Sequence, residues 1–165
     1  MATDATETTQ AAARRALSTR QQEALDLLAT LERTAAFVRG CLARSLAEEI
    51  GLLPDEAALL VELDAAPEQR LRMADASRSL GVSKSGVTRL VDRMEERGLL
   101  ERAACPRDRR VTYVGLTAAG RDTLARAMPV LASAAETHLA GRLGAAELHA
   151  VLAGLRKVVG AEAPV

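Results

Sequence analysis

The spacing of apolar residues predicts a mostly helical chain. From Gln21 to about Gly51, apolar residues recur at steps of three and four, which places them on one face of a long helix. Pro54 suits the first turn of a second helix, because its missing N–H would be unpaired there. A short extended piece from Leu71 to Met73 and a short helix from Ala74 to Leu80 are expected to follow.

The centre of the chain carries the clearest amphipathic helix. Gly81 is expected to end the preceding helix and Ser83 to cap this one, while Gly98 ends it. Leu99–Arg102 and Val111–Leu116 are predicted to be β-strands joined by a polar loop, AACPRDRR. The apolar face of the helix is formed by Val87, Leu90, Val91 and Met94. The predicted order is therefore helix, turn, helix, hairpin.

Two further helices complete the predicted chain. Thr117 is expected to cap the first, and the apolar positions of the second run from Leu143 to Val159. Residues 1–20 lack sustained periodicity and are expected to form a flexible N-terminal tail. A length of 165 residues suits one domain, here residues 21–165. The predicted fold class is mainly α with a small β-hairpin (α+β).

The charges are unevenly distributed, although 22 basic residues balance 22 acidic ones. Between Arg70 and Arg110, eleven basic residues stand against six acidic ones, so this segment is expected to face an anion. The polar face of the central helix lies inside it and consists of Lys84, Ser85, Thr88, Arg89 and Arg93. Such a helix fits the major groove of double-stranded DNA, and Gly86 would let its backbone approach closely.

The hairpin loop adds a second cationic element. Its sequence CPRDRR places Arg107, Arg109 and Arg110 at a projecting tip, which can reach a neighbouring minor groove. Asp108 is expected to hold the Arg110 guanidinium in a fixed pose rather than to contact DNA through its own charge.

Other classes of protein lack support in the sequence. No apolar window is long enough to span a membrane, and Met1–Gln10 has no signal-peptide pattern, so a cytoplasmic location without membrane association is expected. No catalytic motif is present, so the chain is not expected to be an enzyme. No cofactor is expected. His138 and His149 lack further ligands at metal-binding spacing, so no metal site is expected either.

These residues resemble the MarR family of winged helix-turn-helix transcriptional regulators. The resemblance covers about Leu53 to Gly120, including RLRMADASRSLGVSKSGVTRLVDRMEERGLLER, the wing PRDRR with its Asp-x-Arg pattern, and VTYVGLTAAG. It implies a DNA-binding region at residues 53–120 and dimerisation helices at 21–52 and 121–160. It also implies a homodimer on a pseudo-palindromic operator, with Arg110 in the minor groove. Recognition-helix contacts carry over to Ser83, Lys84, Ser85, Gly86, Thr88 and Arg89.

The function favoured by the sequence is a sequence-specific regulator, in the first place a repressor, that is released by a small-molecule effector. Non-specific or architectural DNA binding remains an alternative, since it needs the same charges without base selectivity. A winged-helix protein-interaction module is a further alternative, although it would not need the arginines. Redox sensing through Cys41 or Cys105 also stays open, with core packing favoured for Cys41.

Overall fold

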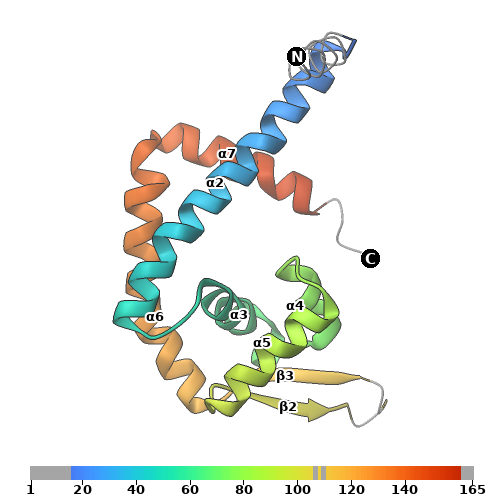
Figure 1. Cartoon of the computed structure of the whole chain (residues 1–165), viewed down its shortest axis with the longest axis vertical. Coiled ribbons are helices and arrows are strands. Elements are labelled where there is room, and N and C mark those ends of the chain that lie inside the picture. Colours follow the sequence, from blue (N-terminus) through green and yellow to red (C-terminus); the bar gives the residue numbers. More distant parts are fainter. Residues whose placement is uncertain (1–15, 106–107, 109–110, 161–165) are drawn as a thin grey trace, which may run out of the picture. The chain divides into compact units, whose positions relative to one another are not determined.

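The computed structural model describes residues 16–105, 108 and 111–160. The chain divides into two compact units, residues 1–39 and 40–165. The helix α2 (Thr19–Glu49) begins in the first unit and ends in the second (Figure 1). It begins two residues before the predicted start, so Thr19 and Arg20 belong to the helix and not to the expected tail. The rest of that tail, apart from residues 16–18, lies outside the described residues.

The start of α2 is set by a reciprocal cap. The Gln21 backbone N–H donates to Ser18 Oγ at 3.3 Å, and the Ser18 N–H donates to Gln21 Oε1 at 2.9 Å. This exchange satisfies donors that have no partner inside the helix. The cap lies just before the apolar periodicity that predicted the helix.

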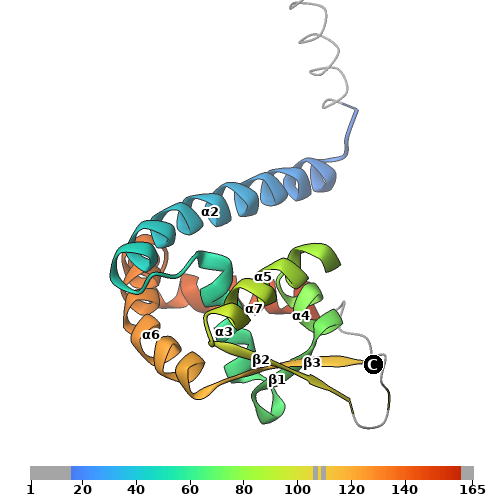
Figure 2. The ribbon, with the colours of Figure 1, turned by 60° about the horizontal axis from the view of Figure 1, so that its bottom comes forward.

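The second unit continues from the last turns of α2. Its elements are α3 (Pro54–Ala65), η1 (Pro67–Gln69), β1 (Arg70–Arg72), α4 (Met73–Ser79), α5 (Lys84–Glu96), β2 (Leu100–Ala104), β3 (Thr112–Leu116), α6 (Ala118–His138), η2 (Ala140–Arg142) and α7 (Ala145–Gly160). The three strands form one antiparallel sheet in the order β1-β3-β2 (Figure 2). This arrangement confirms the predicted fold class, a mainly helical protein with a small hairpin.

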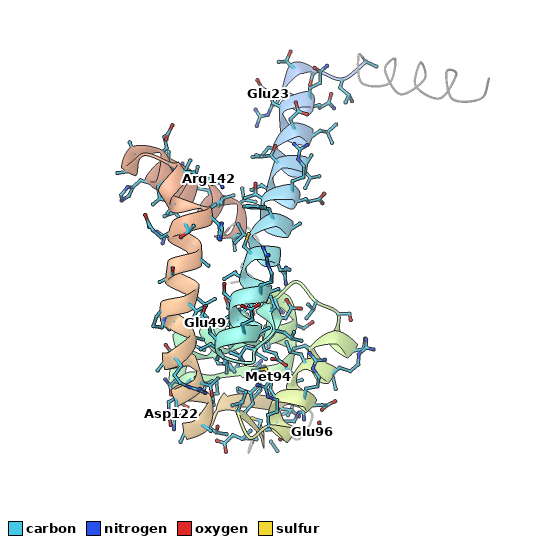
Figure 3. All side chains as sticks on the ribbon, turned by 60° about the vertical axis from the view of Figure 1, so that its left-hand side comes forward. Glu23, Glu49, Met94, Glu96, Asp122 and Arg142 are labelled. Carbon is cyan, nitrogen blue, oxygen red and sulfur yellow. The ribbon has the colours of Figure 1, made fainter. Side chains whose placement is uncertain are left out.

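The core of the second unit surrounds α3. Leu59, Leu60 and Leu63 of this helix are fully buried and pack with Val91 and Met94 of α5. In Figure 3, Met94 points into this interior, whereas Glu96 of the same helix lies at the surface. Burial of the apolar stripe therefore fixes which side of α5 faces solvent.

Glycines end the two helices of the helix-turn-helix, as the sequence predicts. Gly81 and Gly98 have φ of 63° and 70°, a left-handed backbone conformation that is sterically unfavourable for residues with a Cβ atom. After α5, the Leu99 N–H bonds to the Met94 carbonyl and the Gly98 N–H to the Glu95 carbonyl. These two bonds are those of a Schellman cap, so the chain turns sharply from α5 into β2.

A second corner joins β3 to α6. Thr117 caps α6 by accepting the Gly120 N–H at 3.0 Å, and its own hydroxyl lies 2.7 Å from the Gly98 carbonyl oxygen. Gly120 packs so closely that a Cβ atom there would lie 2.1 Å from the Leu99 carbonyl oxygen. The end of α5 and the start of α6 are thereby locked together.

Candidate nucleic-acid interface

The helix α5 presents a polar face that is exposed in the part of the chain that the structure describes. Lys84, Ser85, Thr88 and Arg89 are exposed, while Val87, Leu90, Val91 and Met94 are at most 4% exposed. The Thr88 hydroxyl donates to the Lys84 carbonyl at 2.8 Å, which orients its oxygen as an acceptor toward the outside. The two cationic side chains at positions 84 and 89 thus stand beside small hydroxyl groups.

Ser83 and Gly86 have a structural role at the N-terminus of α5. Ser83 Oγ accepts the Gly86 N–H at 3.0 Å, as predicted for the cap, and lies 3.1 Å from Ser85 Oγ. A Cβ atom on Gly86 would lie 3.2 Å from Ser83 Oγ, a tight contact with the capping hydroxyl. The small size of Gly86 is therefore explained by the cap, whether or not its backbone also approaches DNA.

Arg93 lies differently from the other residues predicted on this face. Its Nε is 3.8 Å from Oε1 of Glu56, a carboxylate of α3 that is only 3% exposed. The Arg93 side chain remains 51% exposed. It therefore lies at the edge of the polar face, drawn toward α3.

Arg102 of β2 connects the hairpin to α5. Its guanidinium bonds to Asp92 at 2.6 Å and to Glu95, and its Nη2 lies 3.4 Å from the Thr88 carbonyl oxygen. The Arg102 backbone N–H also donates to Glu95 Oε1 at 3.3 Å. This side chain pairs with two carboxylates of α5 and ties the hairpin to the helix.

The edge strand β1 carries two more cations. The Arg70 guanidinium lies 5.3 Å from the centre of the Tyr113 ring, a cation–π geometry. A hydrogen bond to the Tyr113 side chain, with the attraction between the two groups, raises the pKa of Arg72 above its ordinary value. Arg72, Lys84, Thr88 and Arg102 also line an open groove of about 590 Å³ between α4, α5 and the hairpin.

The tip of the hairpin lies partly outside the described residues. Arg107, Arg109 and Arg110 belong to the part that the structure does not describe, whereas Asp108 is exposed. Two backbone hydrogen bonds close the turn. The Cys105 N–H donates to the Val111 carbonyl at 2.9 Å, and the Val111 N–H donates to the Asp108 carbonyl at 3.0 Å. The roles of the three arginines and of Asp108 in holding Arg110 stay predictions.

Three residues that hold α5 in place were not predicted from the sequence: Glu56, Arg97 and Arg102. A usable signal was present, because Asp92 and Glu95 are acidic residues one turn apart on a helix expected to face an anion. Such residues call for a cationic partner elsewhere in the fold.

The remaining candidate residues are the two cysteines and the potential metal ligands. Cys41 and Cys105 are both free and partly exposed. Across residues 16–105, 108 and 111–160, no group of three or more potential ligands could hold a metal ion. No helix in this part of the chain is both long and apolar enough to cross a lipid bilayer.

Comparison with known proteins places this geometry among DNA-binding regulators. Residues 50–111 match the model of the MarR family. The chain is 31% identical over 70 residues to the transcriptional repressor MprA of Escherichia coli K12, which covers 42% of this chain and 40% of MprA. The matched part thus spans less than half of that curated relative.

Two solved structures resemble the chain over most of its length. The first is Sco3205 of Streptomyces coelicolor, a MarR family transcriptional regulator in complex with DNA, with 25% identity and a TM-score of 0.75 over 90% of this chain and 91% of Sco3205. The second is CouR of Rhodococcus jostii RHA1 bound to p-coumaroyl-CoA, with 25% identity and a TM-score of 0.70 over 81% and 91%. MprA and Sco3205 are transcriptional regulators and not enzymes, in agreement with the expectation from the sequence.

Proposed function

Because residues 50–111 match the model of the MarR family and the fold resembles that of the MarR family regulator Sco3205, we propose that this chain is a homodimeric repressor of that family that binds a pseudo-palindromic DNA operator. In this proposal a small-molecule effector releases it from the operator. The polar face of α5 carries the proposal: the helix buries its apolar stripe in the core and exposes Lys84, Ser85, Thr88 and Arg89.

This face has the chemistry that major-groove recognition requires. An α-helix fits the major groove of B-DNA, where arginine can donate two hydrogen bonds to guanine. Serine and threonine hydroxyls can bond to base edges or phosphates. Arg89 is therefore assigned to base contact, and Lys84 and Ser85 to the phosphates beside the helix N-terminus.

The hairpin supplies the proposed minor-groove contact. Its strand β2 is held against α5 by Arg102, next to the exposed face of that helix. Arg110, supported by Arg107 and Arg109, is assigned to the narrow minor groove beside the half-site. Asp108 is assigned to orienting Arg110.

The dimer is proposed from apolar surface that each unit leaves open. In the second unit, α7 has no buried residue, and Val151, Leu152, Leu155, Val158 and Val159 are 36–74% exposed. In the first unit, Leu25, Leu27, Leu28, Leu31 and Phe37 of α2 are 37–56% exposed. Exposed apolar surface of this kind marks association surfaces, and a second copy can cover both.

Repression is carried over from the name of MprA, and a small-molecule effector is inferred from the ligand bound to CouR. MprA is named a repressor, and CouR was solved with p-coumaroyl-CoA bound. In a dimer matched to two half-sites about one helical turn apart, a change in the spacing of the two α5 helices breaks both sets of contacts. A coupling of about 1–3 kcal/mol is sufficient for such release.

The proposal is tested by selecting duplexes from a random-sequence library with the purified protein. The enriched sequence, here called the selected duplex, is then titrated beside a scrambled duplex at several salt concentrations. We expect a palindromic selected sequence and affinity for it that exceeds the scrambled duplex by at least about 10³-fold. Equal, salt-dependent binding to both duplexes would instead favour the architectural alternative.

A further inference from the structure

Glu56 is a buried charge that the recognition face does not use. It lies in the first turn of α3 and is 3% exposed. Its Oε2 accepts the Leu53 N–H at 3.0 Å, and Arg93 Nε lies 3.8 Å from its Oε1. An ionised carboxylate at such a site is costly unless it is paired and hydrogen-bonded. Its retention in the core therefore calls for a specific partner.

That partner is Arg97, the C-cap residue of α5. Arg97 Nη1 donates to Glu56 Oε2 at 2.9 Å, and its Nη2 donates to the Gly51 carbonyl oxygen at 2.8 Å. One planar guanidinium thus bridges two acceptors on opposite sides of the turn between α2 and α3. A guanidinium can do this because its donors form a fixed fork.

The turn that Arg97 spans is where α2 ends. Gly51 has a φ of 73°, and the Leu52 N–H donates to the Leu46 carbonyl at 3.1 Å. Leu46 and Leu52 are both buried in the core of the second unit. A rotation of the last turn of α2 against α3 would move the Gly51 carbonyl but not the Glu56 carboxylate. Arg97 would then lose one of its two bonds, and the end of α5 would be released.

We propose that Arg97 and Glu56 are positioning residues that tie the orientation of α5 to the turn between α2 and α3. This inference deepens the proposed function and rests on it. The two hydrogen bonds of Arg97 set the orientation in which α5 contacts base edges. Through Arg97, a movement of the last turn of α2 would also change the orientation of α5.

The test compares Arg97→Lys, Arg97→Met and Glu56→Gln with wild type on the selected and scrambled duplexes. Arg97→Lys keeps the charge, but its single nitrogen lacks the paired, planar donors that bridge Gly51 and Glu56. We expect it to lower the ratio of selected to scrambled affinity by about five- to tenfold. Arg126→Lys on α6 is the matched control, since that guanidinium makes a local contact with Thr123 at 3.4 Å and does not bridge two elements among the described residues. Its ratio should equal that of wild type.

A double-mutant cycle separates positioning from a general loss of stability. Glu56→Gln and Arg97→Met should each reduce the ratio, and the double variant should reduce it no further than the more affected single variant. All titrations are made well below the lowest melting midpoint of the set. If Arg97→Met does not fold, Arg97→Lys still decides the question.

Two results contradict the inference, and they are distinguishable. In the first, wild type prefers the selected duplex and Arg97→Lys keeps the full ratio of selected to scrambled affinity, whether or not it loses affinity equally on both duplexes. The positioning role is then wrong while the proposed function stands. If the library yields no enriched sequence, the proposed function fails and this inference falls with it.

Discussion

Single residues fix the position of α5 against its neighbours, and Gly120 is one that leaves no space for a side chain. The Leu99 carbonyl oxygen occupies the position that a side chain at residue 120 would need. This contact brings the start of α6 against the end of α5, where Thr117 bonds to the Gly98 carbonyl. A backbone atom cannot yield as the end of a flexible side chain can.

Gly120→Ala should therefore destabilise the protein by about 1–3 kcal/mol or more, because the added methyl group forces the two backbones apart. The measurement is the free energy of unfolding in urea. Gly40→Ala is the matched control, since a Cβ there meets nothing within 4 Å. It should leave stability unchanged or raise it by up to about 1 kcal/mol. Equal effects of the two substitutions would contradict the close approach.

Arg89 is the residue that the proposed function assigns to a base. Arg89→Ala should cost about 1–3 kcal/mol on the selected duplex and relax preference at one position of each half-site. The free energy of unfolding should hardly change, because Arg89 is exposed. Titration against duplexes that vary each half-site position measures this. A uniform loss on all duplexes would make Arg89 a phosphate contact instead.

At the scale of elements, the function depends on how the hairpin is fixed to α5. Arg102 reaches from β2 to Asp92, Glu95 and the Thr88 carbonyl of α5. Without it, two carboxylates would stand unpaired on the helix that is proposed to approach phosphates. The helix α5 and the strand β2 would also be free to change their relative angle.

Arg102→Met keeps the aliphatic stem and removes the charge. Because the two carboxylates are 48% and 39% exposed, solvent screens the pairs, and the expected loss of stability is only about 1 kcal/mol. The loss should shrink as salt is raised. Arg78→Met is the control, since its i,i+3 pair with Asp75 is exposed and should contribute less. Equal and salt-independent losses in urea unfolding would argue against the clamp.

At the scale of the whole molecule, the exposed stripe of α7 is the surface that the proposed dimer would cover. Leu152→Glu with Leu155→Glu should place two charges in that stripe and convert a dimer into a monomer. Light scattering should then give the 17.4 kDa of one chain, against twice that mass for wild type. Ala153→Glu lies on the opposite side of the same helix and should remain dimeric. A monomeric wild type would remove the basis for palindromic recognition.

The sequence by itself determined the local structure of this protein. The periodicity of Val87, Leu90, Val91 and Met94 predicted which side of α5 is buried, and the structure confirms it. Ser83, Gly81, Gly98 and Thr117 predicted helix boundaries correctly, because caps act within a few residues of the chain. The exposed set at positions 84, 85, 88 and 89 followed from the same periodicity.

Only the tertiary structure decided which charged side chains of α5 pair with residues of other elements. Helical spacing alone placed Arg93 with Arg89, but α3 brings the buried Glu56 to 3.8 Å from it. Glu56 stands in the first turn of α3, where the helix dipole ordinarily favours an acidic residue, so its position along the chain does not indicate a buried ion pair. Its partner Arg97 is 41 positions away, and Arg102 is ten positions from Asp92. Pairing over such separations depends on how the helices and strands pack, which the local pattern of residues does not contain.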